Sequence, residues 1–154
     1  MARLTDSDIR LGAKILTWIG IIDQLSTTRI TRALAPLKLP YPQFVLLVHF
    51  SHRSEEPQTV MRVASAMQQP QPGITKTIQK MLTKKLVRAV AAPDDARSKL
   101  LYLTPKGVET HAKAMAALVP VFRELFEPWS EEDMNDLIGK LDRLKAWLDT
   151  KGRE

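Results

Sequence analysis

Apolar residues recur at helical spacing over most of the chain, and short strand-like runs lie only near residues 90 and 100. The first helical pattern begins behind Thr5, which together with the acids that follow it is a typical N-cap. The pattern predicts one long helix over residues 6–34. Leu11 and Trp18 widen the apolar surface of this helix beyond one core-facing stripe, which indicates that a partner covers its other side.

Three shorter helical patterns occupy the middle of the chain. After a proline-bracketed loop, the second helix runs through Phe44 to Phe50 and is apolar almost all round, so we expect it to be buried. The third helix covers residues 59–67 and is broken by residues 68–71. The fourth helix extends over residues 71–82, with Pro72 in its first turn, where a missing N–H is harmless.

The fourth helix has two faces of opposite character. Its apolar face consists of Ile74, Ile78, Met81 and Leu82, and its opposite face consists of Gly73, Lys76, Thr77, Lys80, Thr83 and Lys84. Gly73 allows the start of the helix to come close to another backbone. Short polar side chains and lysines without any acid suit phosphates and base edges. Two short helices joined by a tight turn, the second exposing such side chains, predict a helix-turn-helix arrangement.

A hairpin and two more helices complete the chain. Residues 86–91 and 98–104 are predicted to be strands around an Ala-Pro-Asp-Asp-Ala turn, with Arg97 near the tip. The pair Thr104-Pro105 supplies an N-cap and a first helical residue for a fifth helix, and a serine followed by acids opens the last one. The predicted fold is therefore mainly α with a small β-hairpin.

Positive charge is concentrated in one part of the chain. The 154 residues carry a net charge of +6, and the stretch 69–107 alone holds eight Lys or Arg against two acids. Because the charges of the two flanks cancel, the surplus lies on the fourth helix and the hairpin. This distribution is typical of a surface that meets a polyanion.

Composition and missing motifs exclude several classes of protein. The length and the balance of residues fit one compact domain over 1–154. The absence of cysteine excludes disulfides, thiolate metal sites and cysteine redox sensing. No apolar run is long enough to span a bilayer, so we expect a cytoplasmic protein with no membrane partner. No Gly-rich phosphate loop or Ser/His/Asp pattern is present, so we expect neither catalysis nor a cofactor.

The hairpin carries a specific motif. The stretch from Asp95 to Gly107, DARSKLLYLTPKG, resembles the D-x-R-x-K-x-x-x-L-T-x-x-G signature of the MarR family of winged helix-turn-helix transcriptional regulators. Upstream, residues 73–82 are similar to the recognition helix of that family and residues 42–47 to the helix before it. The resemblance implies a winged helix-turn-helix fold with long dimerisation helices at both ends of the chain.

The resemblance also implies a mode of DNA binding. Helices within 1–35 and 108–154 would interlock two copies, and residues 36–107 of each would read a pseudo-palindromic operator in double-stranded DNA, as in a repressor. The residues that it assigns to DNA are Gln71, Gly73, Thr75, Lys76, Thr77, Lys80, Lys84, Asp95, Arg97 and Lys99. Arg97 would enter a groove or contact phosphate, and Asp95 would brace either the guanidinium group of Arg97 or the turn.

Two further expectations accompany the resemblance. Trp18, Phe44 and Phe50 would line a pocket for a small aromatic or phenolic effector, with core packing as the alternative for each of them. Lys85 stands where family members commonly have glycine, between the recognition helix and the strand. The fourth helix is therefore expected to end differently from a helix with a glycine C-cap.

Simpler interpretations compete with DNA binding. The lysines of the fourth helix could form a solvated face, and Arg97 could be an ordinary hairpin arginine. The alternative function is a winged-helix module that docks proteins through Leu11, Trp18 and the apolar stripe of the last helix. The basic recognition face argues against this alternative, because a protein-docking helix tends to carry apolar or aromatic anchors there.

The three histidines raise the question of a metal site. His49 and His52 are three residues apart on one helix, a spacing that can place two imidazoles on one face, and His111 is the third. Because no cysteine or nearby acid accompanies them, we expect structural roles and no metal.

Overall fold

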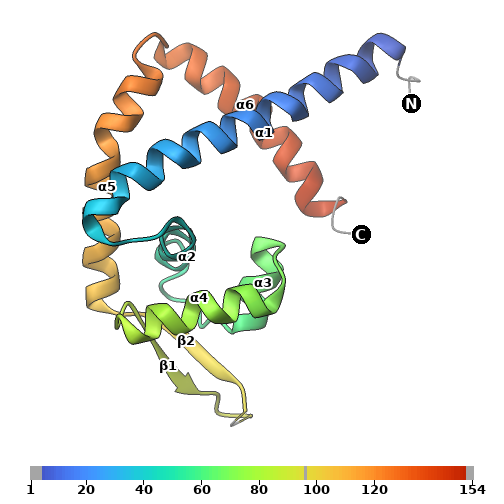
Figure 1. The fold of residues 1–154 in the computed structure, drawn as a ribbon. Coiled ribbons are helices and arrows are strands. Elements are labelled where there is room, and N and C mark those ends of the chain that lie inside the picture. The colour runs from blue at the N-terminus through green and yellow to red at the C-terminus, as the bar shows by residue number, and fades with distance from the viewer. Residues whose placement is uncertain (1–4, 96, 152–154) are drawn as a thin grey trace. The chain divides into compact units, whose positions relative to one another are not determined.

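The computed structural model describes residues 5–95 and 97–151, so Ala96 of the predicted turn and both chain ends lie outside the described residues. The elements are, in order, α1 (Asp6–Leu34), the 3₁₀ turn η1 (Ala35–Leu37), α2 (Tyr41–Ser51), α3 (Val60–Met67), α4 (Gln71–Thr83), β1 (Val87–Ala91), β2 (Lys99–Leu103), α5 (Pro105–Phe126) and α6 (Glu131–Thr150). The fold is mainly helical with one small antiparallel hairpin, as the sequence predicts (Figure 1).

The chain divides into two compact units, Met1–Val119 and Pro120–Glu154. α5 runs through this boundary as one helix with Pro120 inside it. The first unit contains the helix-turn-helix and the hairpin, and the second contains α6. Within the described parts of both units, no helix is both long and apolar enough to cross a membrane.

α1 and α6 begin with the same capping device. The Thr5 hydroxyl oxygen accepts from the N–H of Asp8, and the Asp8 carboxylate accepts from the N–H of Thr5. Ser130 and Asp133 form the same reciprocal pair at the start of α6. Each pair satisfies N–H groups that a helix start leaves without partners, which fixes where these two long helices begin.

Both of these helices leave large apolar side chains uncovered. Leu34 is the buried residue of α1, and none of the residues of α6 is buried. The exposed apolar residues include Ile9, Leu11, Ile15, Leu16, Trp18, Ile22 and Leu25 on α1 and Leu137, Ile138, Leu141, Trp147 and Leu148 on α6. Contiguous apolar surface of this kind marks a face that a partner covers.

α2 lies at the centre of the first unit. Leu47 is fully buried, and Leu46 and Phe50 are each 2% exposed, as expected for a helix that is apolar almost all round. α1, α4 and β2 all pack against α2. α4, which carries the polar face, thus packs against the same core as the hairpin.

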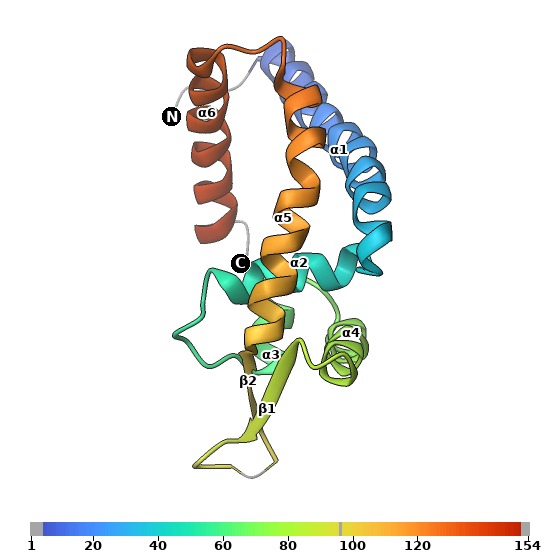
Figure 2. The ribbon, with the colours of Figure 1, turned by 90° about the vertical axis from the view of Figure 1, so that its left-hand side faces the viewer.

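The hairpin pairs β1 with β2 from Val87 opposite Leu103 to Ala91 opposite Lys99. It projects away from the helices of its unit, beside α4 (Figure 2). Gln58, which precedes α3, adds an isolated bridge to β2: its C=O accepts from Leu101 N–H at 2.7 Å, and its N–H donates to Leu101 C=O at 3.4 Å. The middle of β2 is therefore attached to the chain that connects α2 with α3, which fixes the hairpin, hereafter called the wing, to its unit.

Candidate nucleic-acid interface

α3 and α4 are joined by a tight turn that contains no glycine. Gln68 adopts the left-handed conformation with φ 51°, and the N–H of Gln69 returns to the C=O of Ala64 at 3.1 Å. This pattern closes the end of α3 in the way that a glycine C-cap would. Pro70 then serves as the N-cap of α4. The result is the helix-turn-helix that the sequence predicts.

α4 presents two faces, and their burial follows the predicted pattern. Ile74 and Ile78 are each 3% exposed, and Met81 is fully buried. On the other side Lys76 and Lys80 are exposed, and the first turn of the helix contains no acid. An open hollow of about 640 Å³ lies along this outer side and is lined by Gln71, Pro72, Thr75, Lys76 and Gln79.

Two small residues shape the outer side of α4. The Thr77 hydroxyl donates to the C=O of Gly73 at 3.1 Å, so its hydrogen is used inside the helix and its oxygen remains able to accept from a ligand. A Cβ on Gly73 would meet nothing within 4 Å. The expected close approach of Gly73 to a backbone therefore does not occur among the described residues, and the space outside this glycine is open.

The end of α4 differs from the sequence-based expectation at Lys85. Lys85 has φ 59°, the left-handed conformation that glycine would adopt there. Its N–H donates to the C=O of Leu82, and the N–H of Leu86 donates to the C=O of Met81, both at 2.9 Å. These two bonds form a Schellman motif, so α4 ends as a glycine-capped helix does, with lysine at the strained position.

Lys84 also departs from the expectation that it lies on the outer face. Its Nζ donates to the C=O of Lys38 at 2.9 Å and to Oε1 of Gln43 at 2.8 Å. Partial burial, followed by the positive charges of Lys80 and Lys106, lowers the pKa of Lys84. The ammonium group is thus turned towards the protein itself, so the placement of Lys84 among the DNA contacts is not supported by its position.

The last three fixed positions of the motif meet at the junction between β2 and α5. The Thr104 hydroxyl donates to the C=O of Lys85 at 2.7 Å and accepts from the N–H of Gly107 at 3.0 Å. A Cβ on Gly107 would lie 2.2 Å from the Leu86 carbonyl oxygen and 2.7 Å from Leu103 Cδ1. Only glycine fits where α5 begins this close to the end of α4.

The tip of the wing is braced by Asp95. Its Oδ1 accepts from the backbone N–H of Arg97 at 2.9 Å, so the carboxylate holds the turn. Arg97 and Lys99 are exposed. Nearer the base, the Arg88 guanidinium lies 4.6 Å from the ring centroid of Tyr102, its partner across the hairpin.

A partly buried chain of polar side chains leads from α2 to the residue that bridges β2. Arg53 Nη1 lies 3.3 Å from Nδ1 of His49, and His49 Nε2 lies 3.4 Å from Oε1 of Gln58. Because arginine can only donate, Nδ1 accepts and Nε2 carries the proton towards Gln58. Burial is the main cause that lowers the pKa of His49. The neutral imidazole thereby links α2 to the residue that bridges β2.

The other two histidines lie elsewhere. His52 is exposed at the end of α2, and Nε2 of His111 lies 3.5 Å from the Ser51 hydroxyl. Within residues 5–95 and 97–151, no group of three or more His, Asp or Glu is placed to hold a metal ion.

The three residues expected to line an effector pocket differ in their surroundings. Phe44 and Phe50 are 8% and 2% exposed and belong to the core, as the alternative interpretation has it. Trp18 is 51% exposed on α1, with Lys14 Nζ 5.7 Å from its ring centroid. The hollow along α4 and the hollow around Phe126 have other linings.

Sequence reasoning missed the residues that hold α4 and the hairpin in place. They are Gln43, Gln58, Lys106 and, for the physical reason behind its place in the motif, Gly107. A glutamine within an apolar helix was an available signal for Gln43, because buried amides require partners. Nothing local to Lys106 indicates that its Nζ donates to the C=O of Lys84 at 2.9 Å.

A helix-turn-helix followed by a two-stranded wing defines the class as a winged helix-turn-helix protein. The model of the MarR family matches residues 37–98. The transcriptional regulator BldR from Sulfolobus solfataricus is 25% identical, with a TM-score of 0.77 over 93% of this chain and 99% of that chain. Over residues 37–98 the chain is therefore similar to the MarR family, and over most of its length it shares the fold of a solved transcriptional regulator.

Two further solved structures share the fold. A MarR-family transcriptional regulator from Rhodococcus sp. RHA1 is 20% identical, with a TM-score of 0.75 over 87% of this chain and 95% of that chain. A mutant of MarR from E. coli, solved in complex with operator DNA, is 19% identical, with a TM-score of 0.73 over 93% of this chain and 99% of that chain.

Proposed function

We propose that this chain is a sequence-specific regulator of transcription that reads double-stranded DNA with α4 and the wing. The observation that carries the proposal is the outer side of α4. On this side Gln71, Lys76 and Lys80 are exposed, the threonines at 75 and 77 are half-buried and no acid lies among them, while the isoleucines behind them are buried in the core. The E. coli MarR mutant, which shares the fold, was solved in complex with operator DNA, and this supports DNA binding by a chain of this fold.

Within this proposal, the residues on the outer side of α4 and on the wing have different roles in binding DNA. Lys76 and Lys80 contact phosphates and supply most of the affinity. Gln71, Thr75 and Thr77 face base edges in the major groove, where the free lone pairs of Thr77 suit an amino group of adenine or cytosine. Exposed Arg97, on a turn fixed by Asp95, reaches an adjacent groove or its phosphates, with Lys99 beside it and Gly73 leaving room for the backbone.

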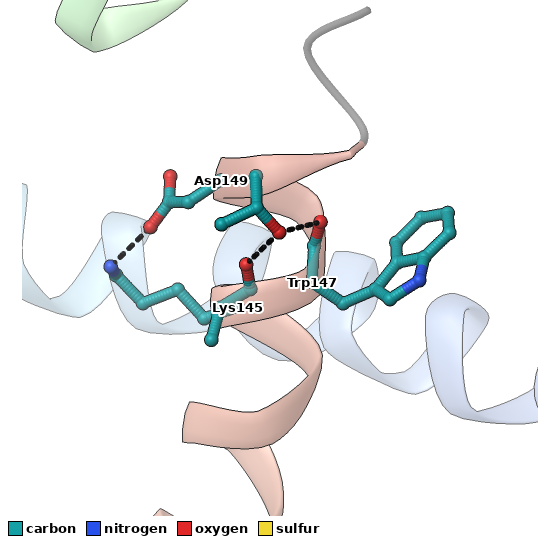
Figure 3. A network of polar contacts seen from close by, with 5 residues as sticks. Lys145, Trp147 and Asp149 are labelled. Carbon is teal, nitrogen blue, oxygen red and sulfur yellow. Dashed lines mark hydrogen bonds and ion pairs between the residues drawn. The ribbon is translucent and has the colours of Figure 1, made fainter.

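The proposed active form is a homodimer. A copy of the same chain would cover the apolar faces of α1 and α6, which the chain itself leaves exposed. At the end of α6, Lys145 pairs with Asp149 on one side while the indole of Trp147 projects from the other (Figure 3). Two α4 helices would then enter successive major grooves about 34 Å apart on a pseudo-palindromic operator.

Release from DNA by a small molecule extends the proposal to a repressor. A ligand bound among α1, α2 and α5 would change the spacing of the two α4 helices only if it binds the DNA-competent and incompetent states with different affinities. No catalytic step is part of this function. The site of action is the compartment that holds the DNA, which is the cytoplasm expected from the sequence.

Binding to selected DNA tests the proposal. Duplexes are enriched from a random library by the wild-type protein, and their dissociation constants are measured over a range of salt concentrations. We expect log K to fall linearly with log salt, with a slope of about −0.9 for each phosphate contacted. Lys140→Ala, which removes a charge from α6, is the control and should leave the slope unchanged. Binding without sequence preference or salt dependence would contradict the proposal.

A further inference from the structure

Lys84 lies at a junction of segments that are far apart in the sequence. Its side chain leaves the C-cap position of α4, and its Nζ reaches the C=O of Lys38 at 2.9 Å and Oε1 of Gln43 at 2.8 Å. These partners are 46 and 41 residues away along the chain. One ammonium group therefore ties the end of α4 to the turn after η1 and to the first turn of α2.

Both acceptors require a donor of this kind. Lys38 is left-handed, with φ 50° and ψ 36°, and its carbonyl lies at the end of η1, where a cation is favoured. Gln43 is 3% exposed, so its side-chain oxygen would be costly to leave without a hydrogen bond. An ammonium group has three donors on a long stem and can satisfy both acceptors at once.

The main chain of Lys84 is held from the opposite direction. Its C=O accepts from Lys106 Nζ at 2.9 Å, and the next carbonyl, that of Lys85, accepts from the Thr104 hydroxyl at 2.7 Å. The end of α4 is thus bonded to the α1–α2 turn on one side and to the start of α5 on the other.

The surroundings of Lys84 disfavour its charged form. Burial and the neighbouring charges of Lys80 and Lys106 lower the pKa of Lys84, whereas a lysine used only to attract DNA would lie in water, as Lys76 does. A lysine that only attracts DNA would be better placed in water. The position of Lys84 therefore suits a side chain whose hydrogen bonds orient α4.

We propose that Lys84 is a positioning residue, which sets the angle at which α4 meets DNA by coupling the end of α4 to the α1–α2 turn. This inference rests on the proposed DNA-reading function and assigns Lys84 no contact with DNA. A tilt at the end of a 13-residue helix moves side chains at its start, such as Gln71, by more than a hydrogen bond tolerates. Reading of base edges should therefore depend on Lys84, whereas attraction to phosphates needs only nearby charge.

Matched substitutions separate positioning from attraction. Lys84→Met keeps the length of the stem and removes the donors, and Lys80→Met removes the same charge from the exposed side of α4. Dissociation constants are measured over a range of salt for a duplex selected by the wild type and for its scrambled sequence. Lys84→Met should weaken binding to the selected duplex about tenfold and leave the scrambled duplex and the salt slope unchanged. Lys80→Met should weaken both and reduce the magnitude of the slope by about 0.9. Lys84→Arg, which keeps N–H donors, should recover part of the loss.

A second variant tests the coupling without altering charge. Gln43→Met should reproduce the loss of Lys84→Met, and the double variant should be no worse than either single one, because both remove the same interaction. Thermal unfolding is recorded for each protein. If the Lys84→Met protein is unstable, the DNA-binding measurements are made on the double variant, in which both polar partners are replaced by apolar side chains.

Three results would overturn the inference. An equal loss on both duplexes with a flatter salt slope would make Lys84 a phosphate contact. Additive losses for Gln43→Met and Lys84→Met would show that the two residues act separately. In both cases the proposed DNA-reading function would stand. A wild-type protein that prefers no duplex would overturn that function and the positioning role together.

Discussion

α1 and α4 are both amphipathic helices of the first unit, yet they present opposite chemistry to the outside. α4 buries its isoleucines and exposes lysine, threonine and glutamine, whereas α1 buries Leu34 and exposes isoleucines, leucines and a tryptophan. A basic face is stable in water and binds reversibly in a salt-dependent way. An apolar face of this extent is costly in water until it is covered. The difference fits the two proposed roles, a lasting dimer interface at α1 and a transient DNA interface at α4.

A charge on the apolar face should have the largest effect. Ile22 is 63% exposed on α1, and Ile22→Asp places a carboxylate where the proposed dimer contact forms. We expect self-association to weaken at least about 100-fold, because an unpaired charge in an apolar contact is poorly tolerated. Sedimentation equilibrium measures the effect, with Gln24→Asp on the same helix as the control. Equal dimer stability in the two variants would break the comparison by removing α1 from the interface.

The second-largest effect is expected on folding stability, when the junction between the end of α4 and the start of α5 is disturbed. Gly107→Ala forces a methyl group against the Leu86 carbonyl, 2.2 Å away, and the backbone must shift to relieve it. We expect a loss of about 2–3 kcal/mol in the free energy of unfolding. Gly139→Ala is the matched control, because a Cβ there meets nothing within 4 Å and alanine favours the helix. Denaturant unfolding that gave both variants the same stability would argue against a tight junction beneath α4.

The third prediction tests whether the basic wing reads DNA sequence, by removing Arg97 from its tip. Arg97→Ala should cost about 1–3 kcal/mol in binding to a selected duplex if the side chain reads a groove, and less on a random duplex. Fluorescence anisotropy on both duplexes measures the difference. Arg143→Ala, which removes an exposed arginine from α6, is the control. Equal losses on the two duplexes would reduce Arg97 to a simple charge contact.

A smaller and favourable effect is expected at the end of α4. Lys85→Gly relieves the left-handed conformation, with φ 59°, and should raise the free energy of unfolding by about 0.5–1 kcal/mol. Lys85→Ala, which removes the same charge but not the strain, should give no such gain. If both variants had the same stability, the side chain of Lys85 and not its backbone would be responsible.

The smallest effect concerns pH. Because burial lowers the pKa of His49 below 6.5, the folded state binds fewer protons than the unfolded state between the two pKa values. Stability should therefore fall as the pH drops below about 6.5 and level off below the folded-state pKa. Unfolding curves of the wild type and of His49→Gln measure this dependence, and the variant should lose it. An unchanged pH profile in the variant would assign the dependence to other groups.

The local patterns of the sequence predict most of the fold. The helix expected over residues 6–34 is Asp6–Leu34, because Thr5 and Asp8 mark its start and the prolines that follow end it. The division of α4 into a buried and an exposed face follows from spacing alone. These features depend on residues within a few positions of each other, where periodicity and capping chemistry operate.

The details of the site depend on contacts that periodicity does not encode. A helical wheel puts Lys84 on the outer face, but its long side chain bends back to acceptors that are remote in the sequence. The expectation for Lys85 was wrong because backbone hydrogen bonds at the helix end outweigh the cost of a left-handed lysine. The groups that touch DNA and any effector remain predictions from the resemblance and the exposed chemistry.

The bridge from Gln58 to Leu101 has a consequence for how the wing meets other molecules. A two-stranded sheet has two open edges, and each is a row of unpaired backbone groups on which a foreign strand can assemble. Gln58 occupies part of the edge of β2, and Arg88 places a cation on β1. Strand addition is thereby opposed at both edges of the hairpin without a full third strand, and under the proposed function the hairpin keeps the narrow width that a groove requires.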